Sequence, residues 1–200
     1  MGTQQIAALE QEIFDLTVQL AELRKAETGT EVADYSFETF DGSVSLRELF
    51  AGRDKLLAIH NMGQACRYCT LWADGLNAFV PHLESTVSVV LLSKDDPATQ
   101  RRMANARGWR FRTASHGGGD YIREQTVQQG QANMPGLVCY ELRDDKIYRK
   151  NACVFGPMDL YCSMWHVLGL AGLSEQDWTP QYNYWRRPQQ MDDGGENLLD

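Results

Sequence analysis

Apolar residues recur at alternating spacings of three and four near the start of the chain, with glutamate, glutamine and aspartate between them. The set is Ile6, Leu9, Ile13, Leu16, Leu20 and Leu23. This heptad stripe predicts an amphipathic helix over about residues 4–26, within an N-terminal appendage of residues 1–27. Because two and a half heptads are too short to be stable alone, the stripe needs a partner surface. That surface is either the chain's own domain or a second copy in a homodimer.

After residue 30 the apolar pattern becomes that of a small α/β domain. Aromatic residues before Asp41-Gly42 and Val44 after it predict a β-hairpin that turns at this dipeptide. Residues 55–62 and 86–93 are near-continuous apolar runs, typical of buried strands, and residues 66–83 between them read as one helix. A strand–helix–strand crossover of this kind implies parallel strands.

Further elements are expected on either side of this unit. Asp96 as N-cap and Pro97 in the first turn predict a helix that runs to about Arg107, before Gly108. Residues 113–120 read as a glycine-rich connector, because the glycine triplet lacks the context of a phosphate-binding loop. The remaining predictions are a short helix at 46–51, hairpin strands at 137–142 and 146–150, and a last helix at 157–170.

The C-terminal extension, residues 173–200, divides into an aromatic part and a polar end. We expect the aromatic part to pack against the domain and the chain from about Gln189 to be disordered. The aromatic residues are Trp178, Tyr182, Tyr184 and Trp185.

Composition and charge narrow the class of protein. The 200 residues are 43% hydrophobic, which suits one globular domain with appendages. The balance of 19 basic against 27 acidic residues gives a net charge of −8, so no basic surface for nucleic acid or an anionic membrane is expected. Acidic residues interrupt the first 25 positions, and no 18-residue apolar run occurs. We therefore expect a cytoplasmic protein without a secretory signal or membrane span.

The cysteines carry the candidate chemistry. There are five, an odd set that argues against a structural disulfide framework in a reducing compartment. Cys66-Arg67-Tyr68-Cys69 is a C-x-x-C motif where a buried strand ends and a helix begins. The helix N-terminus stabilises a thiolate at Cys66, Arg67 adds positive charge, and Cys69 lies within disulfide reach on the same face. The motif predicts thiol redox chemistry.

Other interpretations of the cysteines stay open. A zinc pair would need two more ligands, and no second C-x-x-C or H-x-x-x-H is present. A separate alternative is that these are two inert cysteines at a helix start. A binding module could hold Cu(I) through Cys66, Cys69 and His60 for delivery. The other three cysteines are expected to be buried small hydrophobic residues, Trp72 to pack within its helix and Asp74 to face solvent.

The order of elements and motifs resembles the thioredoxin superfamily over roughly residues 33–172, an α/β fold with a central mixed sheet flanked by helices. More narrowly, the chain resembles a bacterial family of thioredoxin-like proteins of unknown function. Residues 35–63 are similar to the N-terminal hairpin and first core strand of peroxiredoxin-like proteins. The narrower resemblance rests on the C-x-x-C, Leu71-Trp72-Ala73-Asp74, Gly108-Trp109-Arg110-Phe111 and Ser115.

The superfamily resemblance implies a role for each of four site residues. Cys66 takes the place of the attacking cysteine and Cys69 that of the resolving one. Pro135 matches the cis-proline beside the active site, so Met134–Pro135 is expected to be cis and to abut Cys66. His60 falls where thioredoxins keep a buried acid that assists proton transfer, and it is either that group's replacement or a hydrogen-bonded core residue.

Two departures separate the chain from peroxiredoxin-type peroxidases. In the pattern P-x-x-x-[ST]-x-x-C, Ile59 and Gly63 replace the proline and the hydroxyl residue before Cys66. The arginine that peroxiredoxins carry near the position of Pro135 is also missing. The sequence therefore favours a cofactor-free thiol–disulfide oxidoreductase, acting on a protein or small-molecule disulfide with an unknown electron donor. A thiol-dependent peroxidase and a metal-delivery module remain the alternatives.

Overall fold

The computed structural model describes residues 2–182, and our expectations for Tyr184, Trp185 and the polar end lie outside these residues. Within the described residues, eight strands form one mixed sheet in the order β1-β8-β7-β4-β5-β6-β2-β3. The strands are β1 (Thr30–Val32), β2 (Ser36–Thr39), β3 (Gly42–Ser45), β4 (Lys55–Asn61), β5 (Ser88–Ser93), β6 (Arg112–Ser115), β7 (Gly136–Arg143) and β8 (Lys146–Val154).

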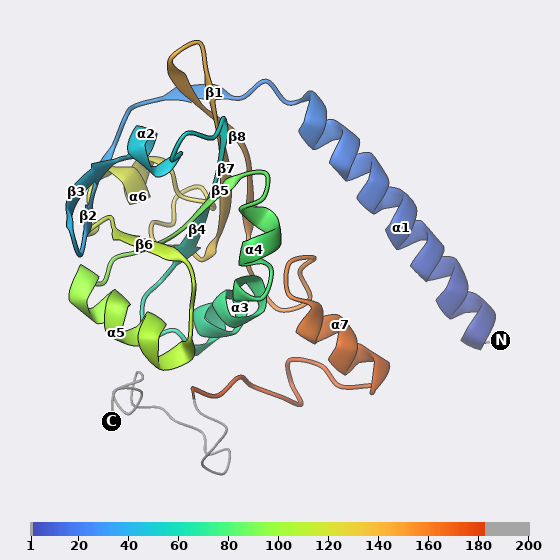
Figure 1. Cartoon of the computed structure of the whole chain (residues 1–200). Coiled ribbons are helices and arrows are strands. Elements are labelled where there is room, and N and C mark those ends of the chain that lie inside the picture. Colours follow the sequence, from blue (N-terminus) through green and yellow to red (C-terminus); the bar gives the residue numbers. More distant parts are fainter. Residues whose placement is uncertain (1, 183–200) are drawn as a thin grey trace.

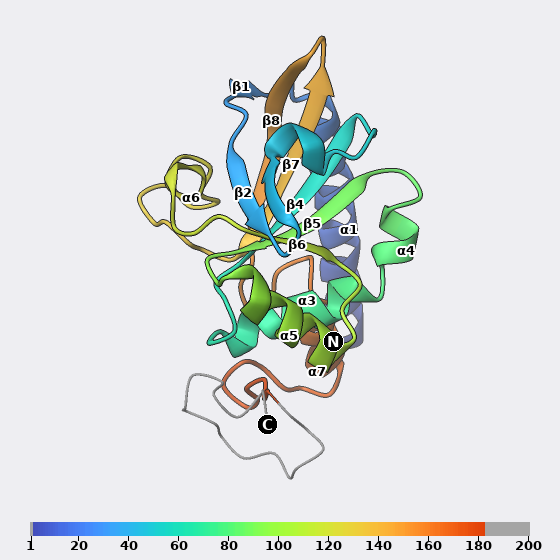
Figure 2. The ribbon, with the colours of Figure 1, turned by 60° about the vertical axis from the view of Figure 1, so that its left-hand side comes forward.

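Seven helices surround this sheet in the described part of the chain (Figures 1 and 2). They are α1 (Gly2–Ala26), α2 (Leu46–Leu49), α3 (Arg67–Asn77), α4 (Val80–Leu83), α5 (Pro97–Arg107), α6 (Asp120–Glu124) and α7 (Ser163–Leu170). None of them, in residues 2–182, has both the length and the apolar character that a bilayer crossing requires.

The centre of the sheet confirms the predicted crossover. Strands β4 and β5, which come before and after α3 in the sequence, pair in parallel. On its other edge, β4 pairs antiparallel with β7. Alternating residues of β4 face two separate cores. Leu56 and Ala58 join the core under α2 and α6, whereas Ile59 joins the one under α3 and α7. His60 follows the same alternation and lies on the α6 side.

Local signals explain the elements that the sequence predicted well. The expected hairpin forms, but its two turn residues are Phe40 and Asp41, and Gly42, at φ 125°, begins β3. The side chain of Asp96 accepts a hydrogen bond from the Thr99 amide and caps α5, and Gly108 ends that helix in the left-handed conformation.

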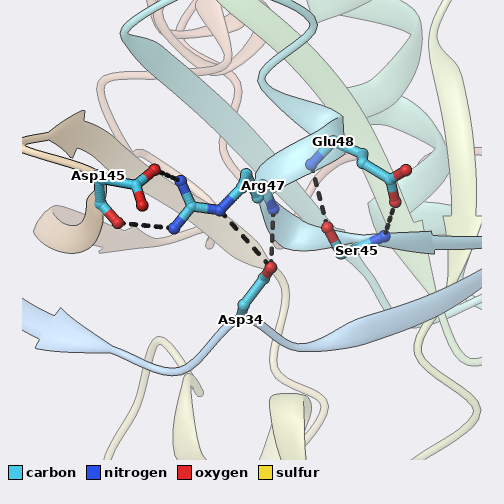
Figure 3. A network of polar contacts seen from close by, with 5 residues as sticks. All are labelled: Asp34, Ser45, Arg47, Glu48 and Asp145. Carbon is cyan, nitrogen blue, oxygen red and sulfur yellow. Dashed lines mark hydrogen bonds and ion pairs between the residues drawn. The ribbon is translucent and has the colours of Figure 1, made fainter.

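A polar network fixes the start of α2 (Figure 3). Ser45 and Glu48 form a reciprocal capping box, in which each side chain accepts a hydrogen bond from the other residue's amide. Arg47 donates to the carbonyl of Asp145 at 2.7 Å, and its amide donates to Asp34 at 2.9 Å. The network therefore joins α2 to the β7–β8 turn and to the chain before β2.

Three predictions about element boundaries were wrong. Residues 66–83 form two helices, because Pro81 has no amide hydrogen to continue the helix and lies instead in the first turn of α4. Residues 112–115, most of which were expected to lie in the glycine-rich connector, form strand β6, which the pairing with β5 holds extended. The last helix begins only at Ser163, because the preceding residues form a turn around Asp159.

Helix α1 stands apart from the sheet along most of its length (Figure 1). It contains no buried residue and is tied to the domain at its last turn, where the Asn151 side chain donates to the carbonyl of Arg24 at 3.1 Å. The guanidinium of Arg24 also lies 5.8 Å from the centre of the Tyr161 ring. Packing of the whole stripe on the chain's own domain, one of the two sequence-based alternatives, is therefore wrong.

Candidate functional site

The C-x-x-C motif lies at the N-terminus of α3, immediately after the loop that follows β4. Cys66 is the N-cap of this helix in an extended conformation, and its Sγ accepts a hydrogen bond from the Cys69 amide at 3.1 Å. A disulfide joins the two residues, with their Cα atoms 5.3 Å apart. The prediction that both cysteines share one end of a helix is confirmed.

The two cysteines differ in their access to solvent. Cys66 is partly exposed, whereas the Cys69 side chain is only 3% exposed and lies against the first turn of α3. Cys66 is therefore the cysteine of the pair that retains contact with solvent. The unpaired amides of the first helical turn are directed towards Cys66, where they favour negative charge on sulfur.

The loop before Cys66 requires glycine at position 63. Gly63 has φ 111°, and a Cβ atom there would lie 2.7 Å from Oδ1 of Asp95. The same carboxylate accepts a hydrogen bond from the Gln64 amide at 2.7 Å, and Asn61 accepts one from the Gly63 amide at 2.8 Å. Any other residue at position 63 would be strained by the positive φ and would have to displace the Asp95 carboxylate.

A cluster around Asp74 holds α3 in place. Its carboxylate accepts two hydrogen bonds from Arg107, the one from Nε being 2.8 Å long, and another from the indole of Trp109 at 2.7 Å. Asp74 was expected to face solvent, and this prediction is wrong. Asp74 and Trp109 belong to two of the short motifs on which the narrower family resemblance rested, but these motifs do not indicate that the two side chains meet.

Trp72 packs within the core under α3, as expected, and makes a polar contact that the sequence did not reveal. Its ring is 2% exposed and stacks on Phe155, with 5.9 Å between the ring centres. Its indole nitrogen donates to Asp159 at 2.8 Å, and Asp159 also accepts from the amides of Tyr161 and Cys162. Asp159 thus fastens the turn before α7 to the dithiol helix.

His60 is fully buried and lies on the α6 face of the sheet. Its Nε2 atom is 2.8 Å from the hydroxyl of Tyr121, and its Nδ1 atom has no hydrogen-bond partner. Burial lowers the pKa of His60 to about 3, with smaller contributions from His116 and Arg149, so the ring is neutral near pH 7. Among the described residues, no hydrogen bond joins His60 to either cysteine.

The expected cis bond before Pro135 is wrong. Residues 2–182 contain no cis peptide bond, so Met134–Pro135 is trans. The chain reverses direction upstream instead, where Gly130 and Asn133 adopt left-handed conformations with φ of 78° and 58°. The Pro135 carbonyl accepts a hydrogen bond from the amide of Phe155 at 2.9 Å, which anchors the start of the β7–β8 hairpin.

The remaining three cysteines are free thiols outside the motif. Cys162 is buried, and Cys139 and Cys153 are partly buried beside an apolar cavity of about 200 Å³. Burial raises the pKa of all three thiols. Within residues 2–182, no three His, Cys, Asp or Glu side chains are arranged to hold a metal ion.

The sheet and the dithiol together define a thioredoxin-like domain. A family model described as "Bacterial protein of unknown function (DUF899)" matches residues 3–191, and the chain belongs to this family. No curated protein matches the sequence.

Solved structures of peroxiredoxin-type proteins share the fold. Peroxidoxin BcpB from Mycobacterium tuberculosis is 20% identical, with a TM-score of 0.54 over 74% of this chain and 99% of its own. The Bacterioferritin Comigratory Protein of Xanthomonas campestris is 15% identical, with a TM-score of 0.52 over 72% and 96% of the two chains. Reduced Prx3 from Vibrio vulnificus is 13% identical, with a TM-score of 0.53 over 73% and 98%. At these identities the likeness shows the fold alone.

Proposed function

We propose that this protein is a thiol–disulfide oxidoreductase in which Cys66 attacks and Cys69 resolves. The observation that carries the proposal is the pairing of a partly exposed sulfur at a helix N-cap with a buried sulfur joined to it in a disulfide. Cofactor-free exchange needs this pairing, because one sulfur must meet the substrate and the other must stay close enough to displace it.

The reaction balances with two electrons from the dithiol. The Cys66 thiolate attacks a substrate disulfide, forms a mixed disulfide and releases the first substrate thiolate. After losing its proton, Cys69 then attacks Cys66 and releases the second thiolate, which leaves the protein with the disulfide seen here. A reductant that supplies two electrons and two protons regenerates the dithiol, and we propose an external thiol or dithiol in the cytoplasm for this role.

Peroxide reduction is the second candidate, and the shared peroxiredoxin-type fold favours it. Alkyl peroxide reduction activity is ascribed to the Bacterioferritin Comigratory Protein of Xanthomonas campestris. The loop of this chain argues against the same chemistry, because Gly63 cannot supply a hydroxyl to the peroxide and Asp95 fills the space beside it. We therefore rank disulfide exchange first.

Trapping variants test the proposal. Cys69→Ser should accumulate mixed disulfides through Cys66 when incubated with oxidised glutathione, since the resolving sulfur is gone. Cys66→Ser should trap almost none, and Cys139→Ser serves as a matched control that should behave like the wild type. Consumption of hydrogen peroxide by the reduced wild type at a rate that exceeds disulfide exchange would favour the peroxidase instead.

The same preparations test the metal-delivery alternative. The reduced protein should be titrated with Cu(I) under anaerobic conditions, with the Cys66→Ser variant as the control. Tight stoichiometric binding that depends on Cys66, together with no exchange with oxidised glutathione, would replace the oxidoreductase with a carrier.

We also propose that α1 joins two copies of the chain. Five of the six apolar side chains of the stripe are more than half exposed, and a surface helix in water does not normally keep such a stripe uncovered. With Ile at the first position of two heptads and Leu at the fourth of three, the pattern suits a two-stranded coiled coil. The stripe is continuous over residues 6–23, so two helices can bury it against each other.

A further inference from the structure

Residues 174–182 run from the end of α7 along the underside of α3 and α5, and we call this segment the strap (Figures 1 and 2). Its first turn is closed by Asp177, whose carboxylate accepts hydrogen bonds from the amide and the hydroxyl of Ser174, each 2.8 Å long. Towards its end, Pro180 and Tyr182 are buried. The strap is therefore held as part of the domain.

The far end of the strap is attached beside Cys66. The Tyr182 hydroxyl donates to the carbonyl of Ala65 at 2.6 Å, one residue before the attacking cysteine. The Tyr182 carbonyl accepts from Nη1 of Arg107 at 2.8 Å, and the same guanidinium is paired with Asp74 on the dithiol helix. The hydroxyl and the carbonyl of Tyr182 thus bind to groups that shape the C-x-x-C site.

The middle of the strap is attached to the motif through aromatic rings. Trp178 meets Trp165 edge to face, with ring centres 5.7 Å apart. Trp165 in turn stacks on Tyr68, one of the two residues between the cysteines, at an interplanar angle of 18°. Every attachment of the strap described here leads to the loop or the helix that carries the dithiol.

We propose that the strap restricts the Cys66 site to low-molecular-weight disulfides, with Tyr182 as the residue that determines this specificity. The inference rests on the proposed thiol–disulfide exchange. Cys66 is partly exposed, so a small disulfide can reach its sulfur. A protein disulfide brings bulky surface against the residues that flank Cys66, and there the strap is already bound. Protein substrates therefore require the strap to open, and small ones do not.

The size of the effect follows from the bond that holds the strap at Ala65. Removing one intramolecular hydrogen bond raises the population of a locally opened state by about two- to tenfold. Tyr182→Phe deletes only the hydroxyl that bonds to Ala65 and keeps the ring. It should therefore raise the reaction rate of large reagents by this factor and leave that of small reagents unchanged.

The experiment compares two alkylating reagents on the reduced full-length protein. Iodoacetamide is the small probe, and a maleimide coupled to a polyethylene glycol chain is the large one, with labelling at Cys66 followed by mass spectrometry. Tyr148→Phe is the matched control, because Tyr148 lies on β8 away from the strap. Thermal melting confirms that each variant folds.

Turnover with two substrates provides the second readout. Wild-type protein should reduce hydroxyethyl disulfide and react slowly with insulin, and Tyr182→Phe should accelerate only the insulin reaction. Equal acceleration of small and large reagents, or no acceleration of the large ones, would overturn the strap proposal and leave disulfide exchange intact. If Cys66 reacted with neither probe in any variant, both the strap proposal and the proposed thiol–disulfide exchange would be contradicted.

Discussion

The backbone amide of Cys69 donates a hydrogen bond to the Sγ atom of Cys66 across 3.1 Å. Because Cys66 is the N-cap of α3, this sulfur takes the place that a serine or aspartate oxygen occupies at other helix starts. When the disulfide is reduced, the same amide is available to a thiolate on Cys66, and the helix dipole acts in the same direction. The local geometry thus favours attack by the first cysteine.

We therefore expect Cys66 to react first among the five thiols. Brief treatment of the reduced protein with limiting iodoacetamide near pH 7 should label it at least tenfold faster than any other cysteine. The reason is that burial raises the pKa of Cys139, Cys153 and Cys162 and so reduces their thiolate fraction. Peptide mapping by mass spectrometry measures the distribution, and even labelling of all five would contradict a nucleophilic motif.

Signals that act within a few residues were readable in the sequence. Asp96 and Gly108 mark the two ends of α5, and the C-x-x-C lies where an apolar strand gives way to a helix. Pro81 was also a local signal for the end of α3 and the start of α4. It was overlooked because the apolar pattern across residues 66–83 predicted one continuous helix. Helix ends can be predicted from such residues because capping and backbone restrictions depend on short-range geometry.

Contacts between segments far apart in the chain could not be predicted from the sequence. The four-residue strand β6 is extended because β5 pairs with it, as at Leu91 and Thr113. The bond between Trp109 and Asp74 joins residues 35 positions apart, and that between Tyr182 and Ala65 joins residues 117 apart. These contacts depend on how the elements pack, which periodicity does not encode.

His60 should make the protein sensitive to acid. Its pKa falls from 6.5 to about 3 on folding, so the unfolded chain binds more protons between these values and stability decreases as the pH falls below 6.5. His116, whose pKa burial lowers to about 4, adds to this loss. For each such histidine the free energy of unfolding should decrease by about 1.4 kcal/mol per pH unit.

The variant His60→Gln isolates the contribution of this residue. Between pH 6 and 5 its unfolding free energy should depend on pH less steeply than that of the wild type, by about 1.4 kcal/mol per unit. Urea denaturation at several pH values measures the slopes, with the exposed His82→Gln as control. An unchanged slope in His60→Gln would show that the ring is not buried in the neutral form. A lower rate of mixed-disulfide resolution in this variant would support a role in proton transfer.

Gly136 should tolerate no side chain. A Cβ atom there would overlap the carbonyl oxygen of Cys153 and lie 2.9 Å from both methyl carbons of Val127. Gly136→Ala should therefore lower the free energy of unfolding by about 2 kcal/mol or more and disturb the adjoining Pro135. Gly75→Ala is the matched control, since it lies in α3 with open space around it and should stabilise the helix by up to about 1 kcal/mol. Equal stability of the two variants by urea denaturation would contradict the close approach at Gly136.

Helix α1 should control the oligomeric state. Ile13→Glu combined with Leu16→Glu places charges in the middle of the apolar stripe, where both side chains are more than half exposed in the single chain. If two copies meet through this stripe, burial of those charges opposes association, and the variant should sediment as a monomer while the wild type sediments as a dimer. Gln4→Glu combined with Gln11→Glu adds the same charge on the opposite face of the helix and should leave the dimer intact. Sedimentation velocity at high micromolar concentration measures all three proteins. A monomeric wild type, or a variant that remains a dimer, would show that the stripe does not join two copies.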